Sequence, residues 1–231
     1  MEPNESVENT KSASEIIASI VDIYDRFSIP PNLRMHMFRV AGVGTLICNA
    51  WKGPPIDRED IVAVLLLHDL GNIVKFDFSS AKGINFLPGE EKQRINFWRG
   101  VKSWVKKKYG TTDHVATINM VKELQIESKL MHLVEEMANA EDLEFDLATS
   151  ENWNLKILVY SDVRVGPFGV ISMQDRFKDL LERYTAPRVE IFRRLFSVCL
   201  EVENQLIPNL QIKPEEINDG AVNPLISKFV K

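Results

Sequence analysis

Residues 57–72 read DREDIVAVLLLHDLGN and contain the longest apolar run of the chain. It opens with an aspartate, a residue type that caps helices, and continues into an unbroken apolar run from Ile61 to Leu67. Gly71 then supplies the backbone freedom that commonly ends a helix. The stretch therefore predicts one buried helix, with His68 and Asp69 adjacent at its end.

Helical signals continue on both sides of this stretch. Ser14 can cap a helix that runs to about Phe27, and Pro30-Pro31 opens a second helix that ends near Trp51. Downstream, helical patterns return over about 91–108, 112–125, 128–140, 152–165, 172–184 and 187–206. No convincing alternating strand pattern appears. The predicted fold class is all-α, a compact bundle of about eight to ten helices.

The domain organisation follows from the same reading. Residues 1–13 are mostly polar and are expected to form a flexible tail. Residues 14–231 are expected to form a single domain, with a core over about 30–180 and a C-terminal helical extension over about 172–231. The irregular stretch 72–89 is too long to be a simple connector, and loops of this length are often functional.

Composition and charge limit the function classes. Apolar residues make up 45% of the chain and charged residues 26%, as in globular proteins that bury a core. The net charge of −5 gives no overall positive field, which argues against nucleic acid as a partner. The longest apolar run is far shorter than the roughly 20 residues that span a membrane, and no signal peptide is apparent. A cytoplasmic protein with reduced cysteines is therefore expected.

Three expected helices each turn one ionisable group toward the interior. His36, His68 and Asp162 share helix faces with apolar residues, namely Leu33, Val40 and Ile47; Ile61, Val64 and Leu65; and Leu155, Leu158 and Val159. A lone buried charge is costly, and a divalent cation would remove the cost for all of these groups together. Histidine nitrogens and carboxylate oxygens suit manganese, iron, cobalt, nickel or zinc. Two plainer readings stay open: a hydrogen-bonded core histidine, and an Asp162 that caps its helix or pairs with Arg164.

Three segments carry a resemblance to a known family. HMFRVA at 36–41, LLLHDLGN at 65–72 and YSDVRVGPFGVISMQDR at 160–176 resemble the HD superfamily of metal-dependent phosphohydrolases. That family's pattern is H…HD…D, and His36, His68, Asp69 and Asp162 match it one by one. The resemblance covers roughly residues 30–180. It implies a helical core and one divalent ion (Mn, Fe, Co, Ni, Zn or Mg) held by these four residues.

The resemblance also implies a reaction. A metal-activated water would hydrolyse a phosphate ester or anhydride, with a nucleotide as a candidate substrate, and Asp69 would help to orient that water. Arg39 and Arg164 are candidates for contacting the phosphate, although each could equally be a surface or salt-bridge arginine. The rival interpretation is a non-catalytic HD module that binds a nucleotide or a protein partner and keeps its metal for structure.

The sequence departs from the commonest family pattern after the HD pair. Asn72 stands where the family usually has the lysine of a Gly-Lys pair, and where small nucleotidases of the superfamily commonly have a glutamate. This puts a nucleotidase assignment in doubt. Asp77 fits the second nucleotidase position and is kept as a candidate general acid or base.

The other histidines bear on the number of metal ions. His114 lies in the first turn of an expected helix and could face the site, so it is a candidate for substrate binding. His132 falls off the apolar face of its helix and is expected to meet solvent. One ion is therefore predicted rather than two. The basic segment 102–108, with Trp98 and Trp104 interleaved, is either a solvated helix face with the tryptophans turned inward, or a rim that attracts an anionic substrate or makes a weak nucleic-acid contact. A homodimer is the default expectation for oligomeric state.

Overall fold

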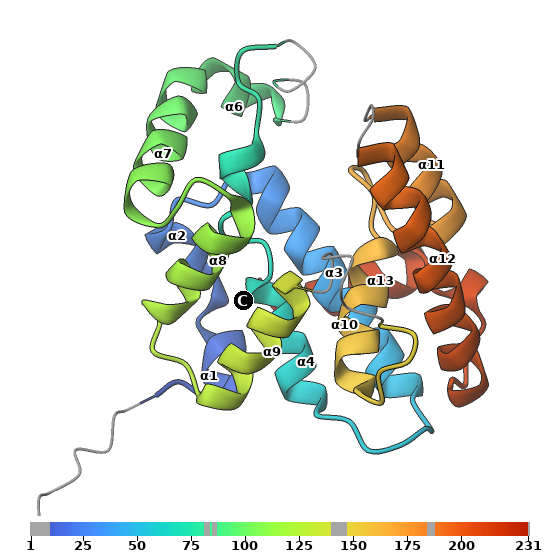
Figure 1. Ribbon diagram of the computed structural model, residues 1–231. Helices are drawn as coiled ribbons and strands as arrows, with labels where there is room; N and C mark the ends of the chain where they lie inside the picture. Colours follow the sequence, from blue (N-terminus) through green and yellow to red (C-terminus); the bar gives the residue numbers. More distant parts are fainter. Residues whose placement is uncertain (1–9, 81–83, 85–86, 140–146, 184–187, 231) are drawn as a thin grey trace, which may run out of the picture.

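The computed structural model describes residues 10–80, 84, 87–139, 147–183 and 188–230. Within these residues the chain forms twelve α-helices and no β-strand, so the all-α prediction is confirmed. In Figure 1, α6 and α7 lie on one side of the molecule and α11 and α12 on the other. Between them lie three helices that make the centre of the fold: α3 (Pro31–Ala50), α4 (Arg58–Leu67) and α10 (Trp153–Val163).

The remaining helices surround this centre. Their bounds are α1 (Ala13–Ala18), α2 (Ile20–Arg26), α6 (Gly89–Gln93), α7 (Ile95–Lys108), α8 (Asp113–Lys122), α9 (Ser128–Asn139), α11 (Met173–Arg183), α12 (Arg188–Leu206) and α13 (Asp219–Ile226). Three short 3-10 helices connect them: η1 (Asn72–Lys75), η2 (Ile207–Asn209) and η3 (Pro214–Glu216).

The pairing of α3 with α4 forms the heart of the core. Every residue of the apolar run Ile61–Leu67 is buried, as the sequence predicts. The two helices approach so closely at Gly44 that a Cβ atom there would lie 2.2 Å from Cδ1 of Leu65. Because any side chain at this position would force the helices apart, Gly44 sets the spacing between α3 and α4.

The start of the first helix differs from the prediction. Ser12, not Ser14, is the N-cap: its hydroxyl accepts from the backbone N–H of Glu15, and the Glu15 carboxylate accepts from the backbone N–H of Ser12. The expected helix 14–27 is also divided at Ser19. Lys11 pairs with the chain at residues 125–127, so order begins inside the expected tail, whose residues 1–9 lie outside the described residues.

The expected C-terminal helical extension includes α13, a helix beyond the last one that the sequence pattern predicts individually. The helix α13 packs against α3, where a Cβ atom at Gly42 would lie 2.7 Å from Cγ1 of Val222. The end of the described chain is therefore part of the wall that supports α3. The division into a core and an extension stays a prediction.

The stretch 72–89 begins with η1, and residues 81–83 and 85–86 of it lie outside the described residues. Among the helices that the structure describes, none has the length and apolar character needed to cross a membrane.

Candidate metal centre

Three central helices bring the predicted ligands together. His36 lies in the second turn of α3, and Asp162 lies in the last turn of α10. His68 is the C-cap residue of α4, and Asp69 follows in the turn that leads into η1. The side chains of His68 and Asp69 can therefore converge on one point because the helix has already ended there.

The interatomic distances describe a compact cluster. One side-chain ligand atom from each of His36, His68 and Asp69 lies within 4.8 Å of the other two. Oδ1 of Asp162 lies 3.2 Å from Nε2 of His36 and 3.6 Å from Nε2 of His68. Oδ2 of Asp69 lies 3.5 Å and 3.8 Å from the same two nitrogens. All four predicted ligands thus face one small volume.

A hydrogen bond fixes the orientation of one imidazole. Nδ1 of His68 lies 2.7 Å from the carbonyl oxygen of Leu65, an acceptor, so Nδ1 carries the proton of the neutral ring. The lone pair of that ring then lies on Nε2, which points into the cluster. Metal-binding histidines commonly have this arrangement, in which the nitrogen that does not bind metal donates to a backbone carbonyl.

Two atoms of the cluster lack a partner of their own. Nε2 of His68 and Oδ1 of Asp162 are shielded from solvent, yet neither makes a hydrogen bond of good geometry within the described part of the chain. Buried polar atoms are normally satisfied, and an unsatisfied one costs about 1–3 kcal/mol. A cation between the imidazoles and the carboxylates would satisfy both atoms. The donor set of two nitrogens and two carboxylates fits a divalent transition metal.

The electrostatics of the cluster favour positive charge. Burial by itself lowers the pKa of His68, but the adjacent Asp69 and Asp162 carboxylates outweigh burial and raise the pKa to about 9. Burial by itself raises the pKa of Asp162, but the imidazoles of His36 and His68 hold the pKa well below its usual range. The two carboxylates therefore attract cationic charge to this point.

The turn that carries the HD pair is fixed against α8. The backbone N–H of Gly71 donates to Oγ1 of Thr117 at 2.9 Å, and a Cβ atom at Gly71 would lie 2.4 Å from the backbone nitrogen of Thr117. Only glycine allows this approach. It brings the N-terminal turn of α8, which carries His114, beside the metal ligands.

His114 lines the same pocket as His68, Asp69 and Asp162. Its Nε2 lies 3.3 Å from Oδ2 of Asp113. Its role in substrate binding stays a prediction. His132 has a side chain that is 73% exposed, as its place on the helix predicts.

Arg39 lies one turn beyond His36 on α3. Its Nε is buried and has no hydrogen-bond partner among the described residues. Arg39 is not among the residues that line the pocket beside the ligand cluster, and its contact with phosphate stays a prediction.

Arg164 is not placed to contact a phosphate, since its guanidinium is buried and makes four hydrogen bonds within the protein. It donates to the carbonyl oxygens of residues 171, 214 and 217 and to the hydroxyl of Tyr160, at 2.7–3.0 Å. Four of the five N–H donors are used in this way, and Arg164 does not line the pocket beside the ligand cluster. Arg164 instead ties the end of α10 to the C-terminal segment.

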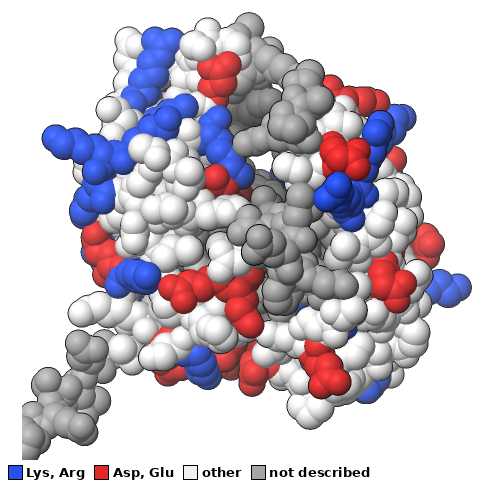
Figure 2. All heavy atoms as spheres, viewed as in Figure 1, with Lys and Arg blue, Asp and Glu red and all other residues white. Residues whose placement is uncertain are grey.

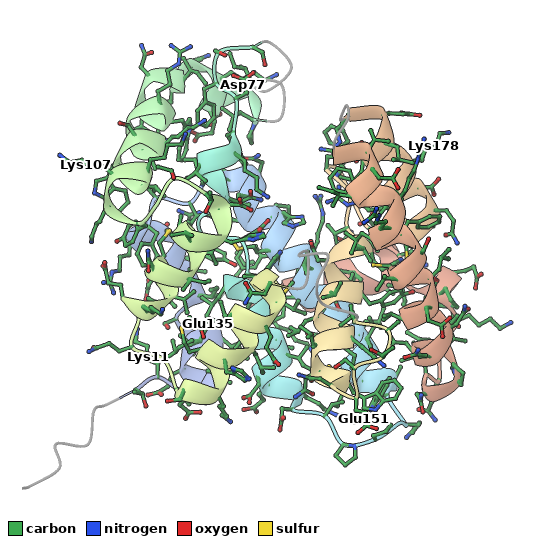
Figure 3. All side chains as sticks on the ribbon, viewed as in Figure 1. Lys11, Asp77, Lys107, Glu135, Glu151 and Lys178 are labelled. Carbon is green, nitrogen blue, oxygen red and sulfur yellow. The ribbon has the colours of Figure 1, made fainter. Side chains whose placement is uncertain are left out.

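Asp77 is the second correction. Its side chain is exposed, and Figure 3 shows it near α6, at the outer end of the molecule. The carboxylate accepts from the backbone N–H and the hydroxyl of Ser79, and these hydrogen bonds hold the pKa of Asp77 far below its ordinary value. A carboxyl group that is always ionised donates no proton and is a weak base. Asp77 also does not line the pocket at the metal ligands.

The basic segment 102–108 lies on α7, where Figure 2 shows Lys and Arg side chains gathered. Of the two tryptophans on this helix, Trp98 is turned inward and 4% exposed, whereas Trp104 is 41% exposed. Lys102 donates to the carbonyl of Phe76, and Arg99 donates to the carbonyl of Phe78. Part of this face therefore fastens the chain that follows η1.

The comparison with known families agrees with this geometry. Residues 34–160, more than half of the chain, match the HD domain family. The chain belongs to the HD domain family. Its HD pair is His68-Asp69, and His36 also lies inside the matched segment, whereas Asp162 lies two residues beyond its end. The family consists mostly of metal-dependent hydrolases. The comparison with curated proteins and the comparison with solved structures found no match to this chain.

Asn72, which the sequence analysis treats only as a departure from the family pattern, contacts the ligand cluster. Nδ2 of Asn72 donates to Oδ2 of Asp69 at 2.7 Å. The signal available in the sequence was its spacing, because a residue three positions after Asp69 can reach back to it across one turn.

Proposed function

We propose that the protein is a metal-dependent phosphohydrolase that cleaves a phosphate ester or anhydride. One observation carries this proposal: the buried, unpartnered Nε2 of His68 and Oδ1 of Asp162 face the same point as His36 and Asp69. Without a bound cation, this arrangement would leave unsatisfied polar atoms in the interior. The match to the HD domain family supports hydrolysis as the reaction class.

Two imidazoles in the ligand set favour manganese, iron, cobalt, nickel or zinc over magnesium, which prefers oxygen ligands. When bound, such an ion supplies Lewis acidity, which activates water as a nucleophile and neutralises charge on a phosphoryl group. The residues that would hold it are His36, His68, Asp69 and Asp162.

The protein's own residues divide the remaining tasks. Asn72 holds the carboxylate of Asp69 in one orientation, which also directs the water that Asp69 would align. Arg39 would bind phosphoryl oxygens through its free Nε, and the charge that develops on the phosphate would be stabilised there. His114 would contact the substrate from the α8 side of the pocket.

The test is reconstitution of the chelator-treated protein with each of the six metals, followed by phosphate release from a panel of esters and anhydrides that includes nucleotides. We expect turnover with at least one transition metal, lost in Asp162→Asn and kept in His132→Ala, whose side chain is largely exposed. A protein that binds metal and hydrolyses no member of the panel would instead be the non-catalytic HD module.

The wider expectations stay predictions. A cytoplasmic location is tested by cell fractionation and a homodimer by sedimentation. Both are independent of the metal centre.

A further inference from the structure

The pocket beside the ligand cluster has an apolar wall. His68, Asp69 and Asp162 form one side of it, and α9, α10 and α12 form the other. The apolar lining residues are Val134, Met137, Ala138, Val159, Val163 and Leu195. Apart from the ligands, His114 is the one polar residue among the described residues that line this pocket.

Residues of the wall belong to the packed core, so the pocket keeps an apolar surface on this side. Val134, Val163 and Val159 are 1%, 7% and 9% exposed, and the helices that carry them pack directly on one another. The cavity measures about 60 Å³. A group that enters it meets methyl and methylene groups on one side and the metal ligands on the other.

Such a pocket discriminates between polar and apolar groups. Each hydroxyl or amide buried there without a partner would weaken binding by roughly tenfold to a hundredfold, because it loses its hydrogen bonds to water. Each methylene buried there would strengthen binding by about fourfold. A ribose or a nucleobase carries several hydrogen-bonding groups, and the apolar side chains that line the wall in the described part of the chain offer them no partner.

We propose that this pocket takes the apolar organic group of a phosphate ester, so that the substrate is an ester of a small apolar alcohol rather than a nucleotide. This inference rests on the proposed phosphohydrolase function and names its substrate class. In the hydrolysis, a water oxygen forms a bond to phosphorus and the bond from phosphorus to the ester oxygen breaks. The leaving ester oxygen takes up a proton from that water, which gives the alcohol and inorganic phosphate.

The closest substrate comparison is propyl phosphate against glycerol phosphate, which have equal numbers of carbon atoms and differ in two hydroxyl groups. With the metal-loaded protein, we expect kcat/KM for propyl phosphate to be at least about tenfold higher. From methyl to ethyl to propyl phosphate, kcat/KM should rise by about fourfold per methylene, and the cavity of about 60 Å³ leaves little room for longer chains. Equal or faster turnover of glycerol phosphate or adenosine monophosphate would overturn the inference.

A pair of variants on α9 locates the effect. Met137→Gln adds polar atoms to the wall and keeps the length of the side chain. It should raise KM for propyl phosphate by about tenfold or more, and it should raise KM for methyl phosphate much less. Met131→Gln is the matched control, because Met131 is also partly buried on α9 and does not line this pocket. Equal effects of the two variants would contradict the assignment of the wall.

Binding of non-hydrolysable phosphonates separates this inference from the proposed function. Propylphosphonate should bind the metal-loaded protein more tightly than methylphosphonate, and Met137→Gln should reduce the difference. If this preference appears and no ester is hydrolysed, the phosphohydrolase proposal fails and the apolar pocket stands. If phosphate esters are hydrolysed and chain length affects neither binding nor turnover, the phosphohydrolase stands and the apolar pocket is wrong.

Discussion

Nδ2 of Asn72 donates a hydrogen bond to Oδ2 of Asp69 at 2.7 Å, and this is the same oxygen that lies 3.5 Å from Nε2 of His36. The metal-facing oxygen of Asp69 is therefore held by an amide before any ion binds. Oδ1 of Asn72 is buried and has no hydrogen-bond partner among the described residues. We therefore infer that Asn72 positions the carboxylate of Asp69. Its amide oxygen is left as an unused hydrogen-bond acceptor.

Asn72→Ala should weaken metal binding by about tenfold to a hundredfold, the usual effect of removing a partner of a metal ligand. The reason is that Asp69 would lose the contact that selects its orientation. Calorimetric metal titration measures the change. Asn96→Ala, an exposed asparagine on α7, is the control and should bind metal normally. An unchanged metal Kd in Asn72→Ala would show that Asp69 needs no such support.

Asp69→Ala should abolish metal binding and hydrolysis and leave the helical fold largely intact. One of four ligands is removed, whereas the bundle is stabilised mainly by apolar burial around α3 and α4. Elemental analysis of the purified variant reports metal content, and circular dichroism reports helix content. Full metal occupancy in this variant would show that Asp69 is not a ligand.

The two arginines should behave differently from each other. Arg39→Ala should lower turnover by about 10²–10³ with metal content unchanged, because it removes a preorganised charge beside the phosphate. Arg164→Ala should destabilise the protein by about 3 kcal/mol, because it leaves several buried acceptors without a donor. Thermal unfolding and single-variant kinetics measure both effects. A normal melting temperature in Arg164→Ala would contradict its structural role.

Features of the fold and the site that depend on neighbouring residues in the sequence could be predicted, whereas contacts between residues far apart in the sequence could not. The apolar run before His68 and the register of Asp162 are local patterns, and both predicted buried helix faces that the structure contains. The role of Arg164 could not be predicted in this way, because its carbonyl partners at 214 and 217 lie 50 and 53 residues farther along the chain. Sequence spacing carries no information about such contacts.

Asp77 was misassigned for a different reason. Its position relative to the HD pair was read as a functional position, but the local chain turns so that Ser79 satisfies the carboxylate at the surface. Aspartate followed two residues later by serine commonly forms such a turn. The signal was present in the sequence and was outweighed by the resemblance.

Metal binding to the metal-free protein should release a proton. The pKa of His68 is raised to about 9 by the neighbouring carboxylates, so this imidazole is protonated at pH 7, and an ion needs the lone pair of its Nε2. Metal affinity should therefore fall by about tenfold per pH unit as the pH decreases below about 9. The raised pKa also stabilises the metal-free fold below pH 6.5, and this contribution is lost as the pH rises through about 9.

Calorimetry in two buffers with different ionisation enthalpies measures that release. About one proton per ion is expected at pH 7. His132→Ala should behave like the unmodified protein, because His132 is exposed and lies outside the pocket. Metal affinity that is constant between pH 6 and pH 8 would show that His68 is not protonated in the metal-free site.

The last prediction is a stoichiometry of about one transition-metal ion per chain. The one cluster of three or more potential ligand side chains found in the described part of the chain is formed by His36, His68 and Asp69, and Asp162 adds a fourth ligand from the same side. A second ion would need several further ligands at one place, since incomplete sites bind metal weakly. His114 lines the pocket and could contribute only one nitrogen there.

His114→Ala should therefore keep its one ion and change substrate affinity, and His132→Ala should change neither. Elemental analysis after extensive dialysis gives the ion count, and the KM for a phosphate ester gives the substrate effect. The two variants form a matched pair, because both remove an imidazole from a helix and only one of the two lines the pocket. A count near two that falls to one in His114→Ala would establish a dinuclear centre instead, with His114 as a ligand of the second ion.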